Sequence, residues 1–208
     1  MIKLIIFDFD GTLVDTKEMI FKIIKDTFNK FNYQITSALI KEHLGNSPIR
    51  GTLKHLGINQ KHIESVVSHS NAQTIKLSKK IKQAESLLVL KKLKQNKIIL
   101  SNNVSQFINA VLENLGITFF DKVYGAEDFE TKEQKIKQIM KKEKLFPNEI
   151  IYVGDKTVDV DVARSVRCVS VIISHKASWS TRKEVAAKHP DFIIKDFSEL
   201  PKIVNELN

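Results

Sequence analysis

The sequence predicts an α/β protein built on a doubly wound parallel sheet, with an all-helical segment inserted after the first strand. From about residue 84 onward, short apolar runs alternate with helical periodicity, which is typical of a parallel sheet covered on both faces. From residue 16 to about residue 80 only helical periodicity is found, and no strand is expected there. We therefore expect a Rossmann-like core made of residues 1–15 and 83–208, and a helical cap made of residues 16–82.

Six short apolar runs are expected to form the strands of the sheet. The first, Leu4-Ile5-Ile6-Phe7, is continuous and rich in β-branched residues, as expected for a strand buried on both faces. The run Ile150-Ile151-Tyr152-Val153 has the same character. The other strands are expected at residues 98–100, 122–125, 169–173 and 192–194.

The helices are predicted from apolar residues that recur every three or four positions. In the insert, one helix is expected over residues 16–31, and helical patterns continue to about residue 80 with breaks at Gly45–Pro48 and Gly57. After the insert, helices are expected at residues 84–95, 104–115, 131–144, 158–166 and 197–207. No glycine follows the helix at 158–166, because Val166-Arg167-Cys168 stands there, so its end lacks the commonest stop signal.

Composition limits the class of protein. The 208 residues fit one domain, or one domain with an insert, and the 42% hydrophobic content is enough for a buried core. The single cysteine, Cys168, excludes an internal disulfide and favours a reducing compartment. No signal peptide or membrane-spanning run is recognisable. We therefore expect a cytoplasmic protein with no membrane partner.

The net charge of +9 raises the question of a nucleic-acid partner. The basic residues are nearly all lysines spread over helical stretches, and no aromatic-interleaved basic stripe is present. Arginine, the usual reader of bases and phosphates, occurs only at Arg50, Arg164, Arg167 and Arg182. A solvated lysine-rich surface explains this pattern better than a nucleic-acid face, and the charge would attract small anionic substrates.

Two carboxylates follow the first strand directly, in Asp8-Phe9-Asp10-Gly11-Thr12. Aspartate and glycine are ordinary turn formers, so a simple polar turn is the alternative interpretation. A pair of acids at the carboxyl end of a buried strand also suits the binding of a hard cation and attack on phosphorus. In open α/β sheets, ligands bind at this edge.

Further polar residues follow other predicted strands and helix starts. Ser101 and Asn102 end the second core strand, Asp155 ends a later one, Asp159 comes four residues after it, and Lys132 begins a helix. Each has an ordinary alternative as a turn, capping or surface residue. Since the carboxyl ends of parallel strands share one edge, we expect these residues to converge on a single pocket.

With these motifs, the sequence resembles the haloacid dehalogenase superfamily, and within it the phosphoglycolate phosphatase-like group with a helical cap. The resemblance rests on Asp8-Phe9-Asp10-Gly11-Thr12, Ser101-Asn102, Lys132 and Gly154-Asp155-Lys156-Thr157-Val158-Asp159, and it spans essentially the whole chain. It implies phosphotransfer rather than dehalogenation, because members that dehalogenate lack the second aspartate of the first motif.

The resemblance also implies a role for each residue. Asp8 would be the nucleophile, Asp10 the proton donor and acceptor, and Ser101 and Lys132 would hold the phosphoryl group. Mg²⁺ would be bound by Asp8, the backbone carbonyl of Asp10 and Asp155, with Asp159 binding through water or orienting Lys132. The expected substrate-binding residues are Gly11, Thr12, Asn102 and, from the cap loop, Arg50.

The function expected from the resemblance is that of a Mg²⁺-dependent phosphatase acting on small anionic phosphorylated metabolites through an aspartyl-phosphate. Two alternatives stay open at this point: a phosphosugar mutase-type phosphotransferase, and a non-catalytic binding protein on the same fold. The sequence leaves open whether the protein is a monomer or a homodimer, and which metabolite it acts on.

Overall fold

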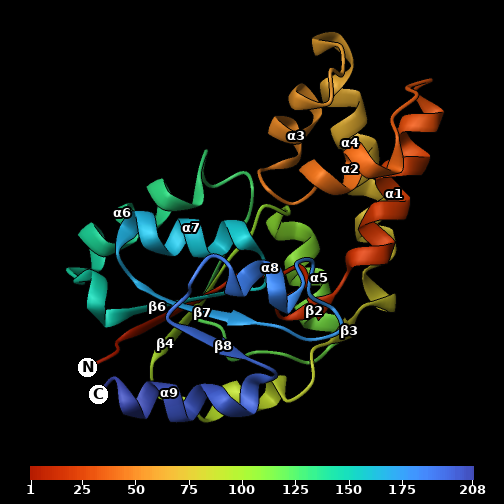
Figure 1. Cartoon of the computed structure of the whole chain (residues 1–208). Coiled ribbons are helices and arrows are strands. Elements are labelled where there is room, and N and C mark those ends of the chain that lie inside the picture. Colours follow the sequence, from red (N-terminus) through yellow and green to blue (C-terminus); the bar gives the residue numbers. More distant parts are fainter.

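The computed structural model describes all 208 residues and is organised around a six-stranded parallel sheet in the order β5-β4-β1-β6-β7-β8 (Figure 1). The predicted α/β architecture is thus confirmed. Both termini lie at the same end of the sheet, where the Ile2 N–H donates to the Asn208 side chain. The strands are β1 (Leu4–Phe7), β4 (Asn96–Leu100), β5 (Lys122–Tyr124), β6 (Ile150–Gly154), β7 (Val169–Ile173) and β8 (Phe192–Ile194).

The strand order reverses direction at β1, and this positions the pocket. The chain goes from β1 to β4 and β5 on one side and then returns to β6, β7 and β8 on the other. Phe7 is in register with Ile99 of β4 and with Val153 of β6. The residues that follow these three strands therefore meet at the topological switch point, where doubly wound sheets bind ligands.

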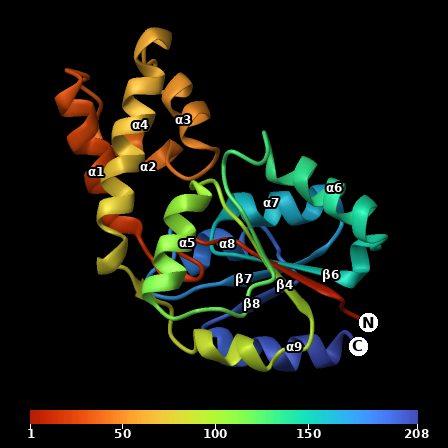
Figure 2. The same ribbon diagram turned by 180° about the vertical axis from the view of Figure 1, so that it is seen from behind.

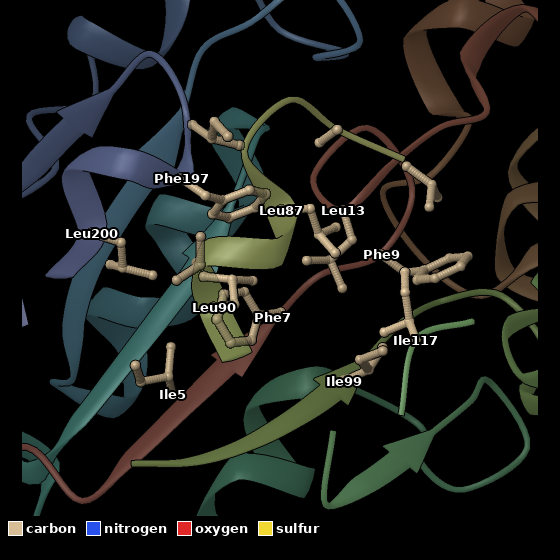
Figure 3. Packing of buried hydrophobic residues seen from close by; sticks show 14 of the residues in the cluster. Ile5, Phe7, Phe9, Leu13, Leu87, Leu90, Ile99, Ile117, Phe197 and Leu200 are labelled. Carbon is tan, nitrogen blue, oxygen red and sulfur yellow. The ribbon is translucent and has the colours of Figure 1, made fainter. Parts of the chain in front are cut away.

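Helices cover both faces of the sheet. On one face, α6 (Lys132–Glu143) and α7 (Thr157–Val166) pack on alternate strand residues, which include Leu4, Ile6 and Tyr152. On the other face, α5 (Ser105–Asn114) and α9 (Leu200–Glu206) pack on Ile5 and Phe7. Figure 3 shows the second layer, in which Leu87, Leu90 and Phe197 close over Phe7. Because successive side chains of β1 point to opposite faces of the sheet, this strand contributes to two separate hydrophobic cores.

The insert forms a helical cap beyond the carboxyl edge of the sheet (Figure 2). It contains α1 (Lys17–Lys30), α2 (Ser37–His43), α3 (Ile49–His55), α4 (Gln60–Lys76) and the 3₁₀ turn η1 (Ser78–Lys80). Two short antiparallel strands, β2 (Val14–Asp15) and β3 (Lys82–Gln83), join it to the core. The absence of strands between residues 16 and 80 is as expected. That residues 16–82 behave as a domain of their own stays a prediction.

The expected helix over residues 84–95 is wrong. The structure has only the 3₁₀ helix η2 (Leu87–Lys92), preceded by Ser86 in a left-handed conformation with φ of 59°. Leu87 and Leu90 are buried three residues apart, while Leu88 is 58% exposed. A 3₁₀ helix has three residues per turn, so both buried leucines lie on the same side of it. Their packing against the core explains why this segment is a 3₁₀ helix and not the expected α-helix.

Several short elements carry too weak a pattern to be predicted. These are α8 (Arg182–Ala186) and the 3₁₀ turn η3 (Pro147–Glu149). The closing helix expected at residues 197–207 begins as the 3₁₀ turn η4 (Phe197–Glu199), which leads into α9. No helix of the fold combines the length and apolar character that crossing a bilayer requires.

Helix α7 ends without glycine, but in the geometry that glycine favours. Arg167 has φ of 61°, and the N–H of the next residue, Cys168, donates to the Ala163 carbonyl at 3.1 Å. A left-handed residue with a Cβ costs about 1 kcal/mol or more, and the greater freedom of glycine in the unfolded chain offsets about half of that.

Arg167→Gly is therefore expected to raise the free energy of unfolding by about 0.5 kcal/mol. Urea denaturation measures the effect. Arg167→Ala is the matched control, because it removes the same exposed side chain and keeps the Cβ. Equal stability of the two variants would show that backbone strain at this position is not the cause.

Candidate active site

The residues after β1, β4 and β6 line one cavity between the sheet edge and the cap. The volume inside this cavity that water-sized molecules can reach is about 80 Å³. Asp8, Asp10, Ser101 and Asn102 line it from the core, as the sequence predicts. These residues come from two strand ends that are more than 90 positions apart in the chain, and the strand order explains why they meet.

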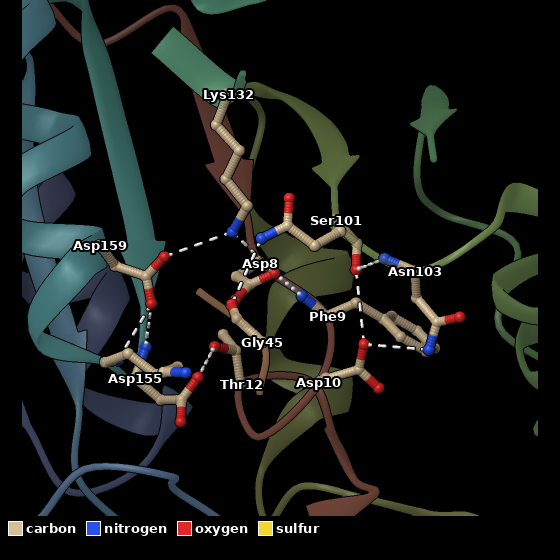
Figure 4. A network of polar contacts seen from close by, with 12 residues as sticks. Asp8, Phe9, Asp10, Thr12, Gly45, Ser101, Asn103, Lys132, Asp155 and Asp159 are labelled. Carbon is tan, nitrogen blue, oxygen red and sulfur yellow. Dashed lines mark hydrogen bonds and ion pairs between the residues drawn. The ribbon is translucent and has the colours of Figure 1, made fainter. Parts of the chain in front are cut away.

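Asp8 lies at the centre of a buried polar network (Figure 4). Its Oδ1 lies 3.0 Å from Lys132 Nζ and accepts a hydrogen bond from the Phe9 N–H at 2.8 Å. The Asp8 residue is 7% exposed. Burial raises the pKa of Asp8 to about 6, an effect that Lys132 partly opposes and that the charges of Asp159 and Asp10 reinforce.

Lys132 is held from three sides. Besides Asp8, its ammonium contacts Tyr152 Oη at 2.8 Å and Asp159 Oδ1 at 3.3 Å, and the Tyr152 hydroxyl itself donates to Asp159 Oδ1 at 3.0 Å. Burial disfavours the charged ammonium, but the Asp8 and Asp159 carboxylates outweigh it and raise the pKa of Lys132. The lysine therefore stays protonated at neutral pH beside Asp8.

Asp159 connects this network to the loop after β6. Its Oδ2 accepts the backbone N–H groups of Asp155 and Lys156 at 3.1 and 2.9 Å. A Cβ on Gly154 would lie 2.3 Å from the Asp159 carboxyl carbon, so only glycine fits there. The structure thus places Asp159 behind Lys132, the orienting arrangement that the sequence analysis offered for it.

Asp10 points away from Asp8 toward the base of the cap (Figure 4). Its Oδ1 accepts from Thr16 Oγ1 at 2.7 Å, and its Oδ2 accepts from Asn103 Nδ2 at 3.2 Å with Ser101 Oγ at 3.5 Å. Burial raises the pKa of Asp10, and these hydrogen bonds only partly oppose the rise. A carboxyl group of raised pKa at the cavity wall is suited to carrying a proton.

Asp155 is fully buried beside Asp8. Its Oδ1 accepts from Thr12 Oγ1 at 2.9 Å, and its Oδ2 accepts from the Trp179 N–H at 2.5 Å. Burial raises the pKa of Asp155 well above its usual value, and the charges of Asp159 and Asp8 add to the rise. One carboxylate oxygen from each of Asp8, Asp155 and Asp159 lies within 4.8 Å of the others. Such a cluster fits a hard divalent cation, whose charge would offset this repulsion.

Gly11 and Thr12 build the turn and lie apart from the substrate side of the site. Gly11 has φ of 80°, and a Cβ there would lie 2.1 Å from Trp179 Cδ1. Its N–H donates to the Val14 carbonyl at 2.9 Å, and the Thr12 hydroxyl is used on Asp155. Neither residue lines the cavity. The structure therefore does not support the expectation that they bind substrate, because their polar groups are already satisfied within the core.

Asn102 and Arg50 were both expected to contact substrate, but only Asn102 lies at the cavity. Asn102 lines the cavity and donates to the Gly45 carbonyl of the cap at 3.3 Å. Arg50 instead forms a two-pronged pair with Glu64 on the outer side of the cap, at 2.8 and 2.7 Å. It does not line the cavity, so the structure does not bring it to the site.

Four residues of the site were not assigned by the sequence analysis. Asn103 follows Ser101 and Asn102, and Tyr152 and Lys156 lie within or beside the last motif, so position could have pointed to them. Trp179 reaches the cavity from the loop after β7, where no pattern marks it. Its indole Nε1 is buried without a hydrogen-bond partner.

Comparison with known proteins agrees with this geometry. The sequence model of the family described as haloacid dehalogenase-like hydrolase matches residues 5–173. Phosphoglycolate phosphatases of Synechococcus elongatus and Vibrio cholerae are 27% and 26% identical, and each alignment covers 98% of this chain and 97% of the relative. A haloacid dehalogenase-like family hydrolase from Streptococcus pneumoniae has the same fold, with a TM-score of 0.79 over 98% of both chains at 21% identity.

The acidic cluster predicts that divalent cations stabilise the protein in a pH-dependent way. Asp8 and Asp155 have pKa values above those of the unfolded chain, so in the metal-free protein the stability falls as the pH rises through the folded values. A bound cation removes that penalty at neutral pH, whereas protons compete with it near pH 5.

Thermal unfolding with added Mg²⁺ is expected to show a larger rise in Tm at pH 7.5 than at pH 5.5. At a hundredfold excess over Kd the stabilisation is about 2.7 kcal/mol, or roughly 5–10 °C for a chain of this size. Asp155→Asn is expected to lose most of the shift. The same shift at both pH values would argue against cation binding by these carboxylates.

Proposed function

The chain belongs to the haloacid dehalogenase-like hydrolases, and on this premise we propose that it is a Mg²⁺-dependent phosphatase that forms an aspartyl-phosphate on Asp8. The observation that carries the proposal is the buried pair of Asp8 and Lys132, 3.0 Å apart, beside a cavity large enough for a small ligand. The relatives that match over nearly the whole chain are phosphoglycolate phosphatases, which supports a phosphoric monoester hydrolase acting on a small phosphorylated metabolite.

In the first step, an Asp8 carboxylate oxygen attacks phosphorus, and the bond from phosphorus to the leaving oxygen breaks. Lys132 lies against the attacking carboxylate and reduces its repulsion with the phosphate dianion. Asp10, whose raised pKa favours the protonated form, gives its proton to the leaving oxygen. Ser101, whose hydroxyl lies near Asp10, is placed to hold a phosphoryl oxygen.

In the second step, water attacks the phosphorus of the aspartyl-phosphate, and the bond between phosphorus and the Asp8 oxygen breaks. Asp10 now takes a proton from that water, so the same residue returns to its starting state. The products are the alcohol and inorganic phosphate. Thr16 and Asn103 hold both Asp10 oxygens during this cycle and keep the carboxyl group at the cavity wall.

The residues proposed to hold Mg²⁺ are Asp8, Asp155 and the backbone carbonyl of Asp10, which accepts no hydrogen bond in the turn. When bound, the ion would supply positive charge that offsets the repulsion of the phosphate by the carboxylates. Asp159 already accepts hydrogen bonds from Lys132, Tyr152 and two backbone N–H groups, so we assign it the support of Lys132 and of the ligand loop.

A phosphotransferase that returns the phosphoryl group to a sugar would use the same first step. Product analysis separates the two, because a mutase forms an isomeric sugar phosphate and releases no inorganic phosphate. A binding protein without turnover would not need the full set of Asp8, Asp10, Lys132 and Asp155 in reacting positions. A cytoplasmic location and a monomeric or homodimeric state remain predictions.

Asp8→Asn is expected to lower Mg²⁺-dependent phosphate release from p-nitrophenyl phosphate by roughly a thousandfold or more, since the amide cannot form the acyl-phosphate. Asp26→Asn, the same change on the exposed face of α1, is the control. EDTA is expected to abolish activity of the parent protein. Undiminished turnover by Asp8→Asn would refute the assignment of the nucleophile.

The proton-transfer role of Asp10 makes a separate prediction. Asp10→Asn is expected to lose about 10²–10⁴-fold in kcat/KM with an alkyl phosphate, whose leaving oxygen needs a proton. The loss with p-nitrophenyl phosphate, whose phenolate leaves without help, should be smaller in the first step. Burst kinetics distinguish the steps, because an aspartyl-phosphate would accumulate. Equal losses without a burst would contradict this role.

A further inference from the structure

The cavity carries very little positive charge. The cap contributes only uncharged residues to its wall, and they are Ile20, Ile24, Leu44, Gly45, Ser47, Ile49, Thr52, Ser70, Asn71 and Thr74. Arg50, the cap residue expected to read an anionic substrate group, is paired with Glu64 outside the cavity. Lys132 lies behind Asp8 and does not reach the wall. Lys156, from the core, is the one basic residue that lines the cavity.

The Lys156 ammonium is buried without an anionic partner. The residue is 9% exposed, and its Nζ donates to the Leu44 carbonyl of the cap at 2.8 Å. It lies 5.2 Å from the centroid of the Trp179 ring, and a Cβ on Gly45 would come within 3.1 Å of it. Lys156 takes part in none of the ion pairs of the protein. A buried cation left unpaired is unfavourable, so an anion in the cavity would offset its cost.

We propose that Lys156 is the specificity determinant of the site, binding a carboxylate carried by the leaving group of the substrate. The inference rests on the proposed function, in which Lys132 supports the attacking carboxylate of Asp8. One of the three ammonium N–H groups is used on Leu44, and the remaining two match the two oxygens of a carboxylate.

The same contacts link recognition to closure of the cap. Leu44 lies in the cap, whereas Lys156 immediately precedes α7 and Trp179 follows β7, both in the core. The ammonium therefore has its full set of contacts only while the cap rests on the core. A carboxylate that binds Lys156 favours this closed arrangement, and a neutral leaving group does not.

The test compares kcat/KM for 2-phosphoglycolate and for its carboxamide, in which an NH₂ group replaces one carboxylate oxygen and removes the charge at nearly the same shape. The parent protein is expected to prefer the carboxylate, and Lys156→Met, which keeps an unbranched apolar stem, is expected to lower that ratio about tenfold or more. Lys156→Arg should retain more of the preference than Lys156→Met. Circular dichroism and thermal unfolding confirm that each variant is folded.

Lys17→Met is the matched control. Lys17 also joins cap to core, through the Ser178 and Trp179 carbonyls at 3.2 and 3.3 Å, but it does not line the cavity. It should leave the ratio unchanged. If Lys156→Met lowers kcat/KM equally for both compounds, or if Lys17→Met changes the ratio as much, Lys156 does not read the carboxylate and the inference is wrong.

Equilibrium binding keeps this test independent of turnover. Trp179 is the only tryptophan of the chain and lies under the Lys156 ammonium, so its fluorescence reports occupancy directly. In the Asp8→Asn background, the carboxylate should bind at least about tenfold more tightly than the carboxamide, and Lys156→Met should abolish the difference. Equal Kd values would overturn the inference even if phosphatase activity holds. Selective binding without any turnover by the parent would instead refute the proposed function alone.

Discussion

The ion pair of Asp8 and Lys132 is the interaction on which the rest of the site depends. Four carboxylates gather around the carboxyl edge of the sheet, and Lys132 is the only basic residue that forms ion pairs with them. Tyr152 and Asp159 hold it in place from the strand and helix that follow in the chain. Removing Lys132 would leave the buried Asp8 carboxylate without its partner, which is strongly destabilising, whereas removing Asp8 leaves Lys132 paired with Asp159.

This concentration of acids has an energetic consequence for the fold. Burial raises the pKa values of Asp8, Asp10 and Asp155, and repulsion by neighbouring carboxylates adds to the rise at Asp8 and Asp155, so the metal-free site lowers stability at neutral pH. The apolar layers on both faces of the sheet must compensate for it. Sites that are destabilised in this way are common where chemistry needs charges that a stable core would exclude.

The sequence predicts the sheet well because its strands are short apolar runs that serve one purpose, burial. It predicts Asp8, Asp10 and Asp155 because each lies within three residues of the end of such a run. It fails where a contact across the fold decides the outcome. The segment around Leu87 follows its partners on the sheet instead of its own helical pattern. The Thr12 hydroxyl donates a hydrogen bond to Asp155, 143 residues later in the chain, and a local motif cannot reveal such a contact.

The roles of Arg50 and Lys156 also depend on contacts across the fold that the sequence does not reveal. An arginine in a cap loop is a reasonable reader of anions, but Glu64, fourteen residues later on α4, lies close enough to pair with it. Lys156 stands inside a motif whose aspartates draw attention first. That it points into the cavity depends on Leu44 and Trp179, which come from two other parts of the chain.

The cap has a hydrophobic cluster of its own, around Phe28, Leu53 and Val66, and Trp179 is the one residue from outside the insert that packs against it. Mutations inside this cluster can therefore accumulate without disturbing the strands that carry the acids. We expect lineages with this architecture to change their substrates by drift within the insert, while the chemistry at the sheet edge is inherited intact. Trp179 contacts both the cap cluster and Asp155 in the core, so we expect substitutions at this position to be the most constrained.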